Sequence, residues 1–227
     1  MSVDPAAHEG PEHLCLDATP LIHFNNKGHL DTLAALVGDP TFTPEYILEQ
    51  EIRAPMQTGA GLFRKNSAIL AAPWLFGASL DDDAGVERVA RLKRRLGGSP
   101  RENLGEAHVL ALAERHGWTV VMEDEGGRLA AADAGDGPVV PTVYMVTLLA
   151  VGAGFGVIST TEAWAVHKAI EDERRRSILR TERADKRIFD RCVATFAKLD
   201  GKTEPWPEVL ARGRTLDDLI VLERRAG

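Results

Sequence analysis

Apolar and polar residues follow one another along the chain in a pattern that predicts short strands separated by helices. Apolar runs of strand length cover residues 14–16, 41–43, 69–75, 118–122 and 139–140. Apolar residues recur at helical spacing over residues 21–37, 45–53, 84–96, 105–116, 128–132 and 143–151. This alternation is typical of α/β proteins with a central parallel sheet. We therefore expect an α/β fold with a central parallel sheet.

The two ends of the chain have a different character. Residues 1–12 are polar and contain proline, which predicts a flexible tail. Beyond residue 160 a helical pattern, formed by one long helix or two, covers 163–199, and a last short helix is predicted over 216–222. We expect a domain over 13–160 and a helical C-terminal extension over 161–227.

One segment, residues 137–161, has no charged side chain and is long enough to cross a bilayer. However, Pro138, Pro141 and three glycines divide it into a short strand, a helix and a loop. We therefore expect a buried strand and helix, and no membrane span.

Charge and cysteine content narrow the class of protein further. Lys and Arg number 27 against 34 Asp and Glu, for a net charge of −7, which disfavours a chain-wide basic surface for duplex DNA. The 2 cysteines do not form a disulfide framework. The N-terminus has neither the basic nor the apolar part of a secretory signal, so we expect a cytoplasmic protein.

The standard phosphate-loop, hydrolase-elbow and zinc motifs are absent, and the remaining candidate chemistry consists of acidic residues at the ends of elements. Asp17 follows the first predicted strand, Glu123 and Asp124 follow another, and Glu106 lies in the first turn of a helix. Because parallel strands share one carboxyl edge, Asp17 is expected to meet Glu123 and Asp124 there, and Glu106 falls at an element end along the same predicted edge. Crowded carboxylates favour a hard cation such as Mg²⁺ or Mn²⁺, which suits phosphodiester hydrolysis by water.

Each acid also has a purely structural interpretation. Asp17 can cap a helix together with Thr19, and Glu106 can complement a helix dipole. Residues 123–125 can form a solvated turn, and Glu49 and Glu51 can be surface acids of a helix. We favour the metal site because these acids fall at the ends of elements along one predicted edge.

Four segments, in this order, resemble motifs of PIN-domain nucleases in the branch that includes bacterial toxins. They are Leu-Cys-Leu-Asp-Ala-Thr-Pro-Leu-Ile at 14–22, residues 28–33 with 43–52, Asn-Leu-Gly-Glu-Ala at 103–107, and Met-Glu-Asp-Glu-Gly-Gly-Arg-Leu-Ala at 122–130. The resemblance covers about residues 13–160. It implies a compact α/β/α fold, a metal-dependent ribonuclease site and, for many such proteins, a partner antitoxin.

By position in these motifs, the resemblance implies that Asp17 and Glu106 bind metal and that the Thr19 hydroxyl supports Asp17. Two positions depart from the family pattern. The acid of the second helix falls on Gln50, with Glu51 one place later, and a one-residue shift turns a helix by about 100°. In the last motif Glu123 replaces an aspartate, and Asp124 is the alternative ligand.

The helix over 86–96 carries several cations, among which Arg91, Arg94 and Arg95 are candidates for gripping RNA phosphates. An ordinary solvated helix face is the other interpretation. Apolar residues of the C-terminal extension are expected to pack on the domain or on a second copy in a homodimer.

These observations together predict a Mg²⁺- or Mn²⁺-dependent endoribonuclease, with RNA as substrate and an antitoxin as a partner. Asp17, Glu106 and Asp124 are the predicted catalytic ligands, and Glu123 and Glu51 are further metal ligands. The alternative hypothesis is a catalytically silent PIN-like module that binds RNA or a protein.

Overall fold

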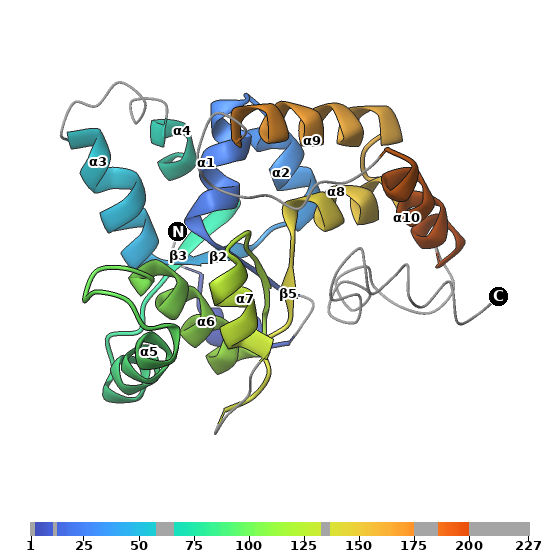
Figure 1. Ribbon diagram of the computed structural model, residues 1–227. Coiled ribbons are helices and arrows are strands. Elements are labelled where there is room, and N and C mark those ends of the chain that lie inside the picture. Colours follow the sequence, from blue (N-terminus) through green and yellow to red (C-terminus); the bar gives the residue numbers. More distant parts are fainter. Residues whose placement is uncertain (1–2, 11–12, 58–65, 133–136, 175–185, 200–227) are drawn as a thin grey trace.

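A parallel β-sheet forms the centre of the computed structural model, which describes residues 3–10, 13–57, 66–132, 137–174 and 186–199 (Figure 1). Within these residues the sheet has 5 strands in the order β3-β2-β1-β4-β5, and every neighbouring pair is parallel. The strands are β1 (Leu14–Leu16), β2 (Thr41–Pro44), β3 (Leu75–Ala78), β4 (Thr119–Val121) and β5 (Thr142–Val143). The predicted α/β class is confirmed.

Helices lie on both sides of the sheet, consistent with a three-layer α/β/α fold (Figure 1). One side carries α5 (Asp83–Leu96), α6 (Leu104–His116) and α7 (Glu125–Ala132). The other side carries α1 (Ala18–Asn26), α2 (Leu30–Val37), α8 (Met145–Gly154) and α9 (Thr160–Arg174). Further elements are η1 (Pro5–Ala7), η2 (Ile47–Arg53), α3 (Ala54–Gln57), α4 (Ser67–Leu70) and α10 (Lys186–Leu199).

The order of the strands creates a switch point at β1. The chain runs outward from β1 to β2 and β3, then returns through α5 and α6 to β4 on the other side of β1. In an open parallel sheet, ligands bind outside the carboxyl ends of the strands at such a point. This topology positions Asp17, which follows β1, beside the segment that follows β4.

The central strands are buried throughout, which explains their unbroken apolar sequence. Leu14, Cys15 and Leu16 of β1 are all buried, as are the three residues of β4. Helix α6 packs against β1, β2 and β4 through an almost wholly apolar surface and ends at Gly117, whose φ of +75° suits glycine. The core therefore fixes the strand ends and the first turn of α6 relative to one another.

Several predicted elements are displaced. Residues 67–70 form helix α4 and the strand is β3 at 75–78, so the predicted strand over 69–75 is wrong. Its apolar run is too short to distinguish a strand from a helix by periodicity alone. The predicted strand at 139–140 is found at 142–143, and α7 begins at Glu125 rather than at Arg128.

The uncharged segment 137–161 forms a buried strand and helix, as predicted. Strand β5 is at the edge of the sheet, and α8 is 10 residues long with 9 of them buried. Within the described residues, no helix is both long and apolar enough to cross a membrane.

The C-terminal helices share the core of the domain. Helix α9 buries Ala163, Val166 and Ile170, and α10 buries Phe189 and Phe196 along with other apolar residues of the same cluster. The predicted helix over 216–222 lies outside the described residues. At the other end, residues 3–10 contact the domain, since the indole N–H of Trp118 donates to the His8 carbonyl.

Candidate functional site

Asp17 is the most buried acidic side chain at the carboxyl edge of the sheet, with 3% of its surface exposed. It follows β1 directly, and its peptide N–H donates to the Val121 carbonyl at 3.1 Å, which fixes it beside β4. Burial, and then repulsion from Glu106, raise the pKa of Asp17 to about 7. The amides of Ala18 and Thr19 and the Thr19 hydroxyl act against this rise.

Glu106 is brought to Asp17 by the first turn of α6. Asn103 adopts a left-handed conformation (φ +56°) immediately before the helix and turns the chain into it. Burial, together with the charge of Asp124, raises the pKa of Glu106, while the backbone of Glu106 and the charge of Lys93 act in the opposite direction. A Cβ on Gly127 would lie 3.6 Å from Cγ of Glu106, so α7 packs directly against this side chain.

Glu51 completes a group of three carboxylates with Asp17 and Glu106. A Cβ built on Gly105 would lie only 2.0 Å from Oε1 of Glu51. The carboxylate of Glu51 therefore rests directly against the backbone of Gly105, at the start of α6. Burial, and then the charges of Asp17 and Glu106, raise the pKa of Glu51 to about 7. The one-residue shift that the sequence shows at this position therefore does not carry Glu51 away from the other acids.

The reason is the shape of η2, which is a π-helix rather than an α-helix. The peptide N–H of Ala54 donates to the Glu49 carbonyl, five residues back, so each turn holds one residue more than an α-helical turn. The wider turn compensates for the position of Glu51, one residue later than in the family pattern. Gln50 is exposed, and Glu51 is directed towards α6.

Asp124 lies at the border of the acidic group. Its carboxylate accepts the peptide N–H groups of Gly126, at 3.3 Å, and Gly127, at 3.1 Å, and so caps α7. The negative charge of Asp124 contributes to raising the pKa of Glu106. Asp124 is thus held in place by the helix that it caps and is adjacent to one of the three buried acids.

Glu123, a further predicted metal ligand, has a backbone partner at the start of α8. Glu123 is 7% exposed, and its Oε1 accepts the peptide N–H of Met145 at 2.7 Å, at the start of α8. The side chain faces a small internal cavity bounded by residues of α8 and α9, including His167 and Glu171. Successive residues of extended chain point to opposite sides, so Glu123 and Asp124 diverge.

The predicted RNA-binding arginines are largely engaged within the protein. Arg91 pairs with the buried carboxylate of Glu114, and Nη1 of Arg95 donates to the Ala130 carbonyl at 3.0 Å. Arg94 is exposed. The charge of Lys93, whose Nζ donates to the Gly97 carbonyl, acts on Glu106, and the charge of Arg101 acts on Tyr46.

An aromatic pair, Tyr46 and His108, lies beside the acids and was not predicted from the sequence. The rings of Tyr46 and His108 are stacked, with centroids 4.4 Å apart and planes within 5°. Burial, and then the charge of Glu51, raise the pKa of Tyr46. Tyr46 lies five residues before Glu51, a spacing that becomes meaningful only if the helix is known to be a π-helix.

Carboxylate oxygens are the donors that Mg²⁺ and Mn²⁺ prefer, so the chemistry of the buried acids fits the predicted ion. In the described part of the chain, no group of three or more His, Cys, Asp or Glu side chains is arranged so that it could hold a metal ion. The side chains interact through their charges, and unscreened carboxylates repel one another.

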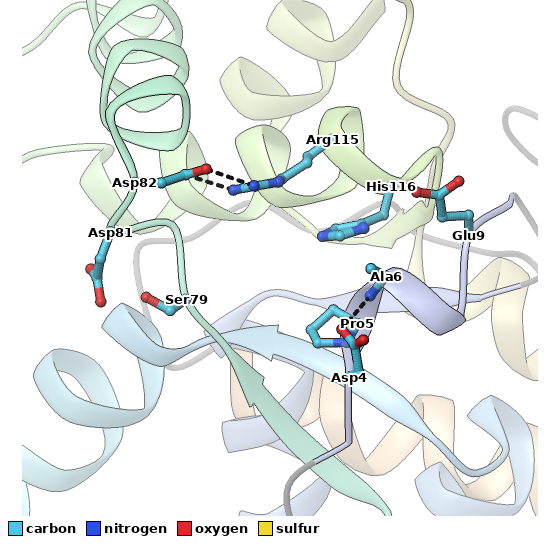
Figure 2. Close-up of a pocket in the computed structure, with 9 residues that line it drawn as sticks. All are labelled: Asp4, Pro5, Ala6, Glu9, Ser79, Asp81, Asp82, Arg115 and His116. Carbon is cyan, nitrogen blue, oxygen red and sulfur yellow. Dashed lines mark hydrogen bonds and ion pairs between the residues drawn. The ribbon is translucent and has the colours of Figure 1, made fainter.

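A separate surface pocket of about 550 Å³ lies between the N-terminal segment, the end of β3 and the end of α6 (Figure 2). Its acids differ from the buried group, because Asp82 forms two hydrogen bonds of 2.7 Å with Arg115. The hydrogen bond from Arg115 is the main cause that lowers the pKa of Asp82. The negative charge of Asp82 is therefore balanced by the guanidinium of Arg115.

Comparison of the chain with models of protein families, with curated proteins and with solved structures finds no match in any of the three.

Proposed function

We propose that this protein is a Mg²⁺- or Mn²⁺-dependent endoribonuclease of the PIN type. The observation that carries the proposal is the acidic group formed by buried Asp17 and partly buried Glu51 and Glu106, which come from three separate parts of the chain. Burial and mutual repulsion raise the pKa of both Asp17 and Glu51 to about 7. Carboxylates that repel one another in this way are suited to a divalent cation, because the bound cation would neutralise their negative charge.

The ion would be held by Asp17, Glu51 and Glu106, with Asp124 alongside. When bound, a divalent ion supplies a water of lowered pKa and neutralises charge on the phosphate. We expect small side-chain rotations to bring the carboxylates together on binding, because a divalent ion offsets their mutual repulsion.

The side chains of the protein itself have distinct tasks in this proposal. Asp17 is held at the switch point by its peptide hydrogen bond to β4, and the Thr19 hydroxyl favours its charged form. Asp124 is oriented by the amides of α7. Lys93 and Arg101 attract the phosphates of RNA to a protein whose net charge of −7 would otherwise repel them.

The toxin–antitoxin role is part of the same proposal, and it rests on the motif order over residues 13–160. It is tested by expressing the protein in bacteria with and without a co-expressed antitoxin candidate. Growth arrest that depends on Asp17 would support this role, and unimpaired growth would remove it.

The experiment that tests the enzymatic activity is Mn²⁺-dependent cleavage of a panel of RNAs. We expect Asp17→Asn and Glu106→Gln each to reduce the cleavage rate by about a hundredfold or more, because each removes a charge that the reaction needs. The exposed acids Asp31 and Glu87 provide matched controls, and Asp31→Asn and Glu87→Gln should leave the rate unchanged. Equal residual cleavage by the wild type and Asp17→Asn would leave an RNA- or protein-binding module as the better description.

A further inference from the structure

A second group of buried titratable side chains lies where the segment after β4 meets α8 and α9. Within the described residues, the buried Asp, Glu and His side chains are Asp17, Glu123, His167 and Glu171. All of these except Asp17 line one internal cavity, whose remaining wall is apolar. Because such side chains are rarely buried without partners, their gathering around one cavity needs a physical reason.

His167 provides the observation that points to a ligand. Its side chain is 5% exposed, and its Nε2 atom is buried with no hydrogen-bond partner among the described residues. The rings of Trp164, at 5.2 Å, and Phe189, at 6.3 Å, pack against the imidazole and hold it in place. Burial, opposed by the charge of Glu171, lowers the pKa of His167 to about 4, so the ring is neutral at neutral pH. Neutral imidazole is the form of histidine that binds metal ions.

Two carboxylates face the same cavity. Glu171 lies four residues after His167 on α9, so the two side chains share one face of the helix. Glu123 reaches the cavity from the end of β4, and its Oε1 accepts the peptide N–H of Met145 at 2.7 Å. Oε2 of Glu171 accepts a hydrogen bond from Lys168. A carboxylate has two oxygens with about four lone-pair positions, so each of these groups can bind an ion in addition to, or in exchange for, its present partner.

We propose that Glu123, His167 and Glu171 bind one divalent transition-metal ion, for which Zn²⁺ is the best candidate. One imidazole nitrogen with carboxylate oxygens is a donor set that suits Zn²⁺. The cavity, of about 10 Å³, has room for a single ion and excludes larger ligands. The site is distinct from the acidic group at the end of β1 and does not depend on the proposed nuclease function. The ion would link the segment after β4 to α9, and so join the C-terminal helices to the sheet.

Binding involves a local rearrangement, because the side chains of the described residues do not already surround one point closely enough to hold an ion. Glu171 is the side chain that we expect to move. Its partner Lys168 has a side chain that is 37% exposed and can therefore return to water when the carboxylate turns to the ion. Lys168 and the metal ion are thus competitors for the same carboxylate.

Calorimetric titration with Zn²⁺ in excess Mg²⁺ tests this site separately from the acidic group. Mg²⁺ prefers oxygen ligands, so it competes for the carboxylates at the end of β1 and leaves the imidazole site to Zn²⁺. The wild type should bind one Zn²⁺ ion, and His167→Gln and Glu171→Gln should each weaken binding at least about tenfold. Lys168→Met should bind about two- to fivefold more tightly, because it removes the competitor.

Two control variants identify the ligands. Asp17→Asn should bind Zn²⁺ like the wild type under these conditions, and so should His29→Gln, which alters a histidine outside the cavity. Thermal unfolding provides a second readout, since an ion that binds only the folded state raises Tm. The rise in Tm on adding Zn²⁺, measured for each variant against its own Tm in EDTA, should be absent in His167→Gln. This comparison separates loss of metal binding from any effect of the substitution on folding, and Lys168→Met tests the site without altering a buried ligand.

The possible results lead to different conclusions. No Zn²⁺ binding by the wild type in excess Mg²⁺, or equal binding by the wild type, His167→Gln and Glu171→Gln, would overturn the inference. Zn²⁺ binding that is lost in Asp17→Asn and kept in His167→Gln would also overturn it, since the ion would then belong to the acidic group. Zn²⁺ binding that depends on His167, in a protein that does not cleave RNA, would retain this site and remove the nuclease proposal.

Discussion

Asp17 shows how a single residue can be held in an unfavourable state by its surroundings. The side chain is 3% exposed, and its pKa is raised to about 7. Between about pH 4 and pH 7 the folded protein therefore retains a proton that the unfolded chain has released. Cys15, two residues earlier on the same strand, is equally buried, and burial raises its pKa as well, which makes it an inert thiol. Cys15 is therefore not a candidate for the chemistry of the site.

The raised pKa of Asp17 predicts how stability depends on pH. Between pH 4 and 7 the folded state binds more protons than the unfolded state, so the free energy of unfolding falls as pH rises through this range. Asp17→Asn removes this loss, and at pH 8 the variant should be more stable than the wild type, by at most about 4 kcal/mol. Tm measured in EDTA at pH 5 and pH 8 checks this.

Other groups also titrate between pH 5 and pH 8, so the contribution of Asp17 is the difference in stability between Asp17→Asn and the wild type at each pH. The stability gain of Asp17→Asn should be less than half as large at pH 5 as at pH 8, because at pH 5 only the unfolded chain has released the proton. Asp31→Asn, at an exposed position, should show no gain at either pH. A gain that is the same at both values would contradict the assigned pKa.

At the scale of elements, the π-helical turn of η2 decides which acid belongs to the site. The sequence places Glu51 one position late for a regular helix, and only the wider turn returns it to Gly105. Such turns often accompany functional sites because they redirect one side chain without disturbing the rest of a helix. Here the redirected side chain is a carboxylate.

An exchange of the two neighbouring residues tests this register. Glu51→Gln should lower the rate of RNA cleavage about a hundredfold, and adding Gln50→Glu should not restore it, because residue 50 is exposed. Cleavage rates of the single and double variants, measured in Mn²⁺, provide the check. Restored activity in the double variant would show that residue 50 faces the site.

Gly105→Ala tests the contact between η2 and α6. The new Cβ would lie 2.0 Å from Oε1 of Glu51, so the carboxylate must move, while alanine slightly favours the helix. We expect cleavage about 10- to 100-fold slower with an unchanged or higher Tm. Asp31→Asn, at an exposed position, is the control and should leave both the cleavage rate and Tm unchanged. Full activity in Gly105→Ala would exclude a role for this contact.

These elements also show what can be predicted from sequence. The pairing of Asp17 with Glu106 followed from the motifs that resemble PIN-domain nucleases, and in the structure the charge of Glu106 acts on Asp17. The position of Glu51 did not follow, because nothing in residues 47–53 distinguishes a π-turn from an α-turn. For Glu123 and Asp124 the strand-end rule selects an edge but does not say to which side each residue points.

At the scale of the whole molecule, the C-terminal helices complete the domain. The apolar faces of α9 and α10 belong to the same core as the sheet, with α10 packed against α8. Gly154 of α8 leaves no room for a side chain, since its Cβ would lie 2.4 Å from Cβ of Phe196. The sequence suggested that this segment packs on something, and apolar periodicity alone did not show whether the surface belonged to this chain.

This packing predicts that α10 is needed for stability. Phe196 is 1% exposed, and Phe196→Ala should lower the free energy of unfolding by about 3–5 kcal/mol. Lys198→Ala, on the exposed side of the same helix, should change it by less than about 0.5 kcal/mol. Urea denaturation followed by circular dichroism measures both. Equal stability of the two variants would mean that α10 is not part of the cooperative unit.

The account as a whole depends on the buried acids binding a divalent cation, and isothermal titration calorimetry with Mn²⁺ tests this most directly. The protein should bind Mn²⁺, Asp17→Asn and Glu106→Gln should each weaken binding at least about tenfold, and Asp31→Asn should bind like the wild type. No binding by the wild type, or equal binding by all four proteins, would contradict the account.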